Sequence, residues 1–401
     1  MQSDTFIPFH RPSIDDDEIN EVVATLRSGW LTTGPRTAQF EKAFAHYVGA
    51  PHALAVNSAT AGLHLSLAAL GIGAGDEVIT TPLTFCSTVN TILQVGATPV
   101  LADIGDDGNI DPGEIEACMT PRTRAIVPVH IAGLPCRMNA IWHLAEQHGC
   151  RVIEDAAHAA GARYLTRPIG SASAGACSDA VVFSFYATKN MTTGEGGMIT
   201  CGSESLADKM RVLCLHGISN DAWNRYTEHG KWYYEVVAGG FKYNLSDIQS
   251  AIGIHQLQKL DRFIEIRRRY AQFYDAAFAD MEELEVPPDS AASRHAWHLY
   301  VLRLNPKHLD IGRDEFIEAL QQRGIGTSVH FIPIPLHPYF AGIPSLMRNP
   351  CPRAIALYRR IISLPLYPAL TEKELARVVE AVKETVRAHR KRVVIAIGHR
   401  A

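Results

Sequence analysis

The feature that most constrains this chain is a regular alternation of short apolar runs with helical patterns from residue 53 onward. The helical patterns fill the gaps between the apolar runs, as at Ala59–Leu70, Asn139–His148 and Glu204–Leu213. Such alternation predicts an α/β fold with a mainly parallel sheet and helices on both faces. The predicted strands are Ala53–Val56, Glu77–Thr80, Thr98–Ala102, Ala125–Val129, Arg151–Glu154, Ala180–Phe185 and Met198–Cys201.

The alternation of apolar runs and helical patterns changes from about Ser246. A long helical run extends from there to about Asp280, and we expect it to be broken or bent near Asp261. We therefore expect a large domain over residues 1–250 and a smaller C-terminal α/β domain over residues 251–401. After a loop at Glu283–Ser293, the predicted elements of the smaller domain are a strand at Trp297–Leu304 and helices near Arg313–Arg323, Pro352–Ile362 and Thr371–His389.

Composition and net charge argue against several classes of function. The formal net charge of -4 over 401 residues argues against a general binder of nucleic acid or of membrane surfaces. No apolar run approaches the length that a bilayer span needs, and the N-terminus lacks the pattern of a secretory signal. The eight cysteines are scattered without a CxxC pair, and His295 and His298 are isolated from other ligand types. We therefore expect a cytoplasmic protein without a metal site.

Two ionisable residues follow neighbouring predicted strands. Asp155 comes directly after the apolar residues of one strand, and Lys189 follows Ser184 in a polar, glycine-containing loop. Taken alone, Lys189 would be read as an exposed surface lysine. A pyridoxal-type cofactor, however, needs a partly desolvated lysine that forms an imine with its aldehyde and then serves as acid and base. It also needs a carboxylate that keeps the pyridine nitrogen protonated, and Asp155 and Lys189 meet these two demands.

A third demand of such a cofactor is a phosphate site. Ser58, Ala59 and Thr60 follow the apolar run ALAV and open a predicted helix, whose N-terminal N–H groups suit an anion. Ser58 taken alone is equally well explained as an ordinary helix N-cap. The hydroxyls of Thr60 and Ser184 would add contacts to the phosphate. Phe85 would stack on the ring, although taken alone it is better explained as a core aromatic residue.

Longer motifs then carry a resemblance to a known family. The segments NSATAGLHL, EDAAHA and FSFYATKN, at residues 57–65, 154–159 and 183–190, resemble the DegT/StrS family of sugar aminotransferases. SGWLTTGP, FKYNLSDIQSAI, AWHLYVLRL and RGIGTSVHF also match, so the resemblance extends over nearly the whole chain. It implies the aspartate aminotransferase-like (type I) fold of transferases that depend on pyridoxal 5'-phosphate (PLP).

The resemblance implies a role for each matching residue. Lys189 would hold the cofactor, Asp155 would pair with the pyridine nitrogen, and His158 would lie near the ring oxygen. Asn244 would reach the phosphate of the neighbouring subunit, which makes a homodimer with shared active sites obligatory. Ala59, Thr60 and Ser184 would hold the phosphate, while Thr33, Glu195, Arg225 and His330 would line the substrate pocket. His330 taken alone is equally well explained as a packed or capping histidine.

The implied reaction is transfer of an amino group from L-glutamate to the C4 keto carbon of a nucleotide-linked sugar, with UDP as the expected nucleotide. The resemblance is strongest to the branch that makes UDP-4-amino-4-deoxy-L-arabinose for the lipid A part of lipopolysaccharide. Two alternatives stay open: an aminotransferase that acts on a non-sugar ketone or at C3, and a non-catalytic PLP-binding regulator. The intact set of Asp155, Lys189 and phosphate residues speaks against the regulator, as does the lack of a basic DNA-binding segment.

Overall fold

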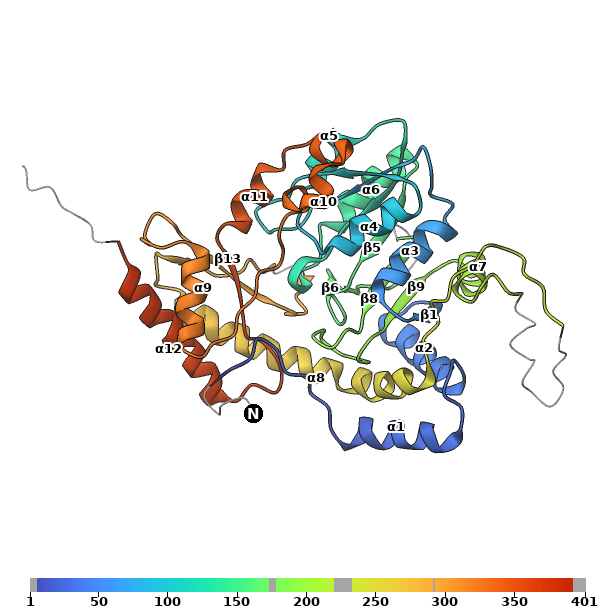
Figure 1. Cartoon of the computed structure of the whole chain (residues 1–401), viewed down its shortest axis with the longest axis horizontal. Coiled ribbons are helices and arrows are strands. Elements are labelled where there is room, and N and C mark those ends of the chain that lie inside the picture. The colour runs from blue at the N-terminus through green and yellow to red at the C-terminus, as the bar shows by residue number, and fades with distance from the viewer. Residues whose placement is uncertain (1–5, 173–177, 220–232, 291–292, 392–401) are drawn as a thin grey trace, which may run out of the picture.

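A seven-stranded sheet forms the centre of the larger part of the molecule (Figure 1). The computed structural model describes residues 6–172, 178–219, 233–290 and 293–391. The strand order is β1-β9-β8-β5-β4-β2-β3, and only β9 runs antiparallel to its neighbours, β1 and β8. The strands are β1 (His52–Val56), β2 (Glu77–Thr80), β3 (Thr98–Leu101), β4 (Thr123–Val127), β5 (Arg151–Asp155), β8 (Ala180–Ser184) and β9 (Gly197–Cys201). The predicted, mainly parallel α/β sheet is confirmed.

Helices cover both faces of this sheet, because its strands are apolar on both sides. On one face, α3 (Ala59–Ala69), α4 (Cys86–Gln94) and α7 (Glu204–Cys214) bury their side chains against the strands. The opposite face is covered by α2 (Pro35–Val48), α5 (Pro112–Cys118), α6 (Met138–His148) and part of α8 (Asp247–Phe278). Outside the two layers lies α1 (Asp16–Ser28), which packs along α8.

Helix α8 joins the two parts of the molecule (Figure 1). It is capped by Ser246 and runs unbroken for 32 residues, so the break or bend expected near Asp261 is wrong. Asp261 is exposed and pairs with Arg294 at 3.2 Å, while Leu260 and Ile264 continue the buried face past it. A charged residue on the exposed side does not interrupt a helix whose apolar face is buried throughout.

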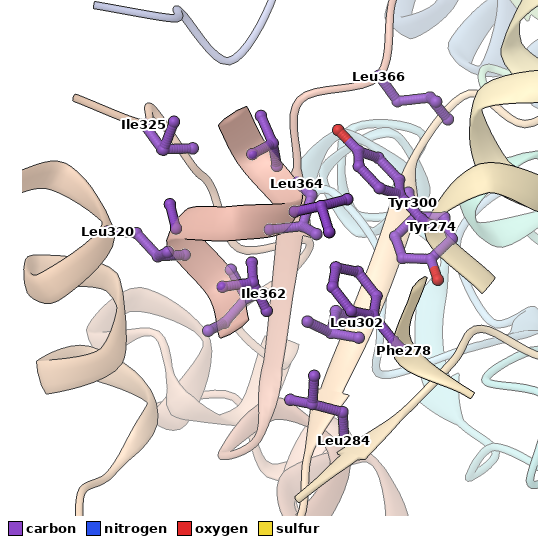
Figure 2. Close-up of a cluster of buried hydrophobic side chains, with 14 of the residues drawn as sticks. Tyr274, Phe278, Leu284, Tyr300, Leu302, Leu320, Ile325, Ile362, Leu364 and Leu366 are labelled. Atoms are coloured by element: carbon purple, nitrogen blue, oxygen red, sulfur yellow. The ribbon is translucent and has the colours of Figure 1, made fainter. Parts of the chain in front are cut away.

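The smaller part is built on a three-stranded antiparallel sheet in the order β10-β12-β13. Its strands are β10 (Leu284–Glu285), β12 (Tyr300–Leu304) and β13 (Ile361–Leu364), and its longer helices are α9 (Arg313–Gln322) and α12 (Glu372–His389). Helix α11 (Pro352–Tyr358) precedes β13 in the chain but packs against residues of the larger part, among them Val89 and Leu101. Tyr274 and Phe278, from the end of α8, pack into its core (Figure 2). The predicted domain boundary near residue 250 falls inside α8 and stays a prediction.

Two predicted elements of this smaller part have different bounds. The strand expected from Trp297 begins at Tyr300, because Trp297 adopts a left-handed backbone with φ 48° that a strand does not allow. The helix expected over Pro352–Ile362 ends at Tyr358, and the apolar residues from Ile361 onward form β13. A short apolar run fits the buried face of a helix and a buried strand equally well. Among the described residues, no helix has the length and apolarity to cross a membrane.

Helix α8 packs closely on α2 at Gly253, and this contact yields a prediction. A Cβ added at Gly253 would lie 2.7 Å from the ring of Phe40, which is fully buried. Gly253→Ala gains about 1 kcal/mol of helix propensity, but overpacking of this kind costs about 1–3 kcal/mol. We therefore expect a net loss of stability in urea unfolding. Gln258→Ala, at an exposed position of the same helix, is the control; a more stable Gly253→Ala variant would contradict the packing argument.

Candidate active site

A cavity of about 470 Å³ lies at the carboxyl ends of β5 and β8. This is the edge where an open α/β sheet binds its ligands. Two later segments, around His298 and around His330, and the N-terminal residue Phe9 complete the wall. The predicted site residues that line this one cavity are Ser58, Ala59, Thr60, Phe85, Asp155, His158, Ser184, Lys189, Glu195 and His330.

Asp155 ends β5 with its carboxylate fully inside the molecule. One carboxylate oxygen accepts a hydrogen bond from Thr88 Oγ1 at 2.8 Å, and the other accepts one from the Ala157 N–H at 3.1 Å. Burial raises the pKa of Asp155, and these two donors, together with the charges of Lys189 and His130, oppose that rise. Asp155 is therefore a buried carboxylate that a cation in the cavity would stabilise.

Lys189 lies on a turn that follows β8. The turn is closed by a hydrogen bond from the Lys189 N–H to Tyr186 O at 2.9 Å, and the side chain faces the cavity. Burial lowers the pKa of Lys189 to about 8, and the charge of Asp155 opposes part of that fall. A substantial fraction of this amine is therefore neutral at physiological pH, as a nucleophile or proton carrier requires.

The N-terminus of α3 forms the anion-binding side of the cavity. Ser58 is the N-cap, and its hydroxyl accepts from the Ala61 N–H at 3.1 Å. The N–H groups of Ala59 and Thr60 belong to the helix turn that has no intrahelical acceptor, so an anion in the cavity would satisfy them. At Gly197 in β9 a Cβ would lie 2.8 Å from Ala59 N, so only glycine lets the strand approach this helix end.

Three histidines form the opposite side. The ring of His158 contacts that of His298, with centroids 4.4 Å apart, and that of Phe331, with centroids 5.7 Å apart, and its Nδ1 is buried without a hydrogen-bond partner among the described residues. His330 bonds through Nδ1 to Ser363 Oγ at 2.8 Å and stacks on Phe9. Burial, and then the charge of Lys189, lower the pKa of His158 well below its usual value and that of His330 to about 4. Both rings are therefore neutral at physiological pH.

Phe85 is not a core residue. It precedes α4, exposes 58% of its surface, and its ring lies 6.0 Å from that of Phe331 at the cavity wall. The alternative of a buried core aromatic is therefore wrong. A ring in this position is free to contact a ligand.

Two of the predicted site residues lie outside the Lys189 cavity. Thr33 and Asn244 line a separate cavity of about 350 Å³, and Asn244 Nδ2 donates to Thr33 Oγ1 at 2.7 Å. They do not reach the Lys189 cavity of their own chain. Arg225, the remaining predicted substrate residue, lies outside the described residues.

Sequence reasoning missed several residues of the cavity. Ser87 comes from α4, Phe9 from the N-terminal segment, and His298 and Phe331 from the smaller part of the molecule. Thr88 of α4 does not line the cavity, but its hydroxyl donates to Asp155. A signal existed for two of them, since His298 and Phe331 lie inside the matching motifs AWHLYVLRL and RGIGTSVHF. Thr88 had none, because its partner Asp155 is 67 residues away in the chain.

The fold and the paired Lys189 and Asp155 define a type I PLP-dependent transferase as the class of this protein. A model of the DegT/DnrJ/EryC1/StrS aminotransferase family matches residues 12–383, and the chain belongs to that family. SpsC of Bacillus subtilis, a spore coat polysaccharide biosynthesis protein, is 52% identical over 384 residues, which cover 95% of this chain and 97% of SpsC.

Solved structures agree with this assignment. Spr1654 of Streptococcus pneumoniae, solved in PLP and PMP forms, matches with TM-scores of 0.87 and 0.88 and 32% and 33% identity, covering 96% and 95% of this chain and 99% of Spr1654. PseC of Helicobacter pylori, an aminotransferase involved in the biosynthesis of pseudoaminic acid, matches with a TM-score of 0.87 and 30% identity, covering 96% of this chain and all of PseC. The protein is thus a sugar aminotransferase of fold type I with PLP as its cofactor.

The donor set of the cavity fits PLP. A ring with an aldehyde, a pyridine nitrogen and a phosphate needs an amine, a carboxylate and an anion site in one cavity. Lys189, Asp155 and the N-terminus of α3 supply these groups, and the unpartnered Nδ1 of His158 offers a hydrogen bond to an oxygen on the ring. When bound, PLP serves as an electron sink for the carbon that exchanges its proton.

The low pKa of Lys189 predicts a measurable effect on folding. Below about pH 8 the folded protein must protonate a buried amine, which costs up to about 3 kcal/mol relative to the unfolded chain. As the pH rises from about 8 to the usual lysine pKa of 10.5, the unfolded lysine binds more protons than the folded one, so this cost disappears. Cofactor-free Lys189→Met should therefore be more stable than wild type at neutral pH and lose that advantage in alkali.

Urea unfolding of both cofactor-free proteins across this pH range measures the difference. Lys209→Met, at an exposed position, is the matched control. A constant difference between Lys189→Met and wild type over the whole range would contradict the burial of the amine.

Proposed function

We propose that this protein transfers an amino group from L-glutamate to the C4 keto carbon of a nucleotide-linked 4-keto sugar, with UDP as the nucleotide. The observation that carries the proposal is the meeting of Lys189, Asp155 and the N-terminus of α3 in one cavity. The names of SpsC and PseC, which concern polysaccharide and pseudoaminic acid biosynthesis, support a sugar as the acceptor. The C4 position, the nucleotide and the link to lipopolysaccharide come from the resemblance alone, and the proposed cytoplasmic location comes from the scattered cysteines.

Lys189 is the proposed acid and base of both half-reactions. Its amine would take up the α-proton of glutamate and pass it to the cofactor, because burial lowers its pKa to about 8 and leaves part of it unprotonated at physiological pH. In the second half-reaction Lys189 would take a proton back from the cofactor and deliver it to C4 of the sugar. Asp155 keeps a positive charge at the cofactor's pyridine nitrogen, and Thr88 holds the carboxylate in place for this task.

The other predicted residues bind and orient. Ser58, Ala59, Thr60 and Ser184 are proposed to hold the phosphate, and His158 the ring oxygen. Glu195 and His330 line the same cavity and are proposed to contact the substrates, together with Phe85. Because His330 is neutral, its ring is suited to hydrogen bonding with sugar hydroxyls and not to ion pairing with a diphosphate.

Asn244 and Thr33 are proposed to serve the active site of a second subunit. They lie together, bonded to each other, and do not line the Lys189 cavity of their own chain. The resemblance gives Asn244 a contact with the phosphate of the neighbouring subunit and Thr33 a contact with the substrate. A homodimer with two shared active sites would let both residues contact ligands in the cavity of the other subunit.

The visible spectrum of the PLP-loaded protein tests the reaction. We expect L-glutamate to bleach the visible band of the bound cofactor and a UDP-4-keto sugar to restore it. Lys189→Ala should keep its fold and lose turnover by several orders of magnitude. Glutamate that leaves the band unchanged would contradict the aminotransferase.

If glutamate bleaches the band and no keto sugar restores it, the proposed acceptor is wrong, but the protein is still an aminotransferase. A panel of non-sugar ketones, and of 3-keto as well as 4-keto sugar nucleotides, then identifies the alternative. The control is Lys209→Met, which changes an exposed lysine and should behave like wild type.

Mixed dimers test the shared active site. Lys189→Ala and Asn244→Ala should each be inactive or severely impaired alone. When the two chains are mixed and allowed to exchange, one site of each mixed dimer unites an intact Lys189 with an intact Asn244. About a quarter of the sites should then regain activity. No recovery on mixing would show that Asn244 serves its own chain.

A further inference from the structure

His298 is fixed from several directions at the edge of the Lys189 cavity. Its backbone N–H donates to Ala132 O at 3.0 Å, and its Nδ1 lies 3.1 Å from Asn190 Oδ1. Its ring lies against that of His158, with centroids 4.4 Å apart. Only 4% of His298 is exposed, although it lines the cavity. His298 is therefore held in one orientation next to the cavity that Lys189 lines.

The hydrogen bonds of Asn190 fix the tautomer of His298. Asn190 Nδ2 donates to Ala296 O at 2.8 Å, so its Oδ1 faces the imidazole. Because an amide oxygen only accepts, the Nδ1 of His298 must carry the proton. The lone pair of the neutral ring therefore lies on Nε2, on the side away from Asn190.

Arg267 of α8 lies behind His298. Its guanidinium is fully buried and donates to the carbonyl oxygens of Trp297 at 3.5 Å, of His298 at 3.2 Å and of Leu366. Its Nε is buried without a hydrogen-bond partner in the described part of the chain, and burial lowers the pKa of Arg267 to about 9. Burial lowers the pKa of His298 well below its usual value, and the nearby His158, Lys189, Arg267 and His330 lower it further. His298 is thus neutral, and its backbone carbonyl accepts a hydrogen bond from the buried guanidinium of Arg267.

We propose that His298 is a positioning residue for Lys189: through Asn190 it fixes the turn that carries the lysine, and with His158 it fills the part of the cavity wall next to that turn. Asn190 is the chain neighbour of Lys189 and is itself buried, so a shift of Asn190 moves the lysine directly. The inference rests on the proposed function in one respect, which is that Lys189 is the residue that binds PLP.

The consequence of losing this ring follows from the local polarity. Without the imidazole, Asn190 Oδ1 would lose its donor, and a space lined by polar groups would open beside His158. Such a space holds water when two or more polar partners are available. Water near Lys189 would stabilise its ammonium form, so the lysine pKa would rise toward its usual value. Loading of PLP, which needs the free amine, would then require a higher pH.

Several charged or titratable groups face Lys189 and bear on this test. Asp155, His158, Glu195, His298 and His330 line the cavity with it. His10 and Arg267 line a small space on its other side, where burial and the charge of Arg267 lower the pKa of His10 to about 4. All of these groups are unchanged in the variants compared, except His298 itself.

The experiment follows the growth of the visible band when pyridoxal 5'-phosphate is added to the cofactor-free protein at different pH values. In wild type we expect the loading rate to rise with a midpoint near the lysine pKa of about 8. His298→Ala should shift the midpoint upward by about one pH unit and slow loading at neutral pH about tenfold. His298→Asn, whose amide nitrogen occupies the place of Nδ1, should retain the bond to Asn190 and show a smaller upward shift.

His295→Ala is the matched control. His295 has the same exposure of 4%, accepts from the Trp297 N–H at 2.8 Å and stacks on Trp297, but it does not line the Lys189 cavity. It should lose thermal stability without a shift of the midpoint. An unshifted midpoint in His298→Ala, or in His298→Asn if the alanine variant does not fold, overturns the inference. If Lys189→Ala develops the same band as wild type, the proposed function itself fails and the inference with it.

Discussion

The site depends on the parallel pairing of β5 with β8. This register places Asp155 beside Val182, near the end of β8, and the chain then turns at Tyr186 to present Lys189 to the same cavity. A carboxylate and an amine that are both removed from water change each other's protonation, and burial is the dominant cause for both. The sheet therefore sets the chemistry of the site as well as its position.

The smaller part of the molecule completes the cavity that the sheet begins. His298 precedes β12, His330 bonds to Ser363 of β13, and Phe9 of the N-terminal segment stacks on His330. These side chains complete the wall of the cavity in which Lys189 is buried, and burial lowers the pKa of its amine although the lysine lies on a turn. Helix α8 holds this arrangement together, because it packs on α2 at one end and enters the second core at the other (Figures 1 and 2).

Much of the site could be predicted because its residues follow recognisable local patterns. Ser58 is a helix cap after a strand, and Asp155 ends an apolar run, so each position follows from chain-local periodicity. The continuity of α8 past Asp261 could not be predicted in this way, since it depends on burial of Leu260 and Ile264 against other elements. The same is true of β13. Its apolar residues fit a continued helix as well as a strand, and their pairing with β12 makes them a strand.

By itself, the sequence determined the α/β fold, the family and the cofactor, because strand and helix periods and long motifs are properties of contiguous residues. Only the tertiary structure decided the protonation of Lys189, the neutrality of His158 and His330, and the separation of Asn244 and Thr33 from the cavity of their own chain. The physical reason is that desolvation depends on what surrounds a group in space. Those surroundings come from segments hundreds of residues apart, and no local pattern encodes them.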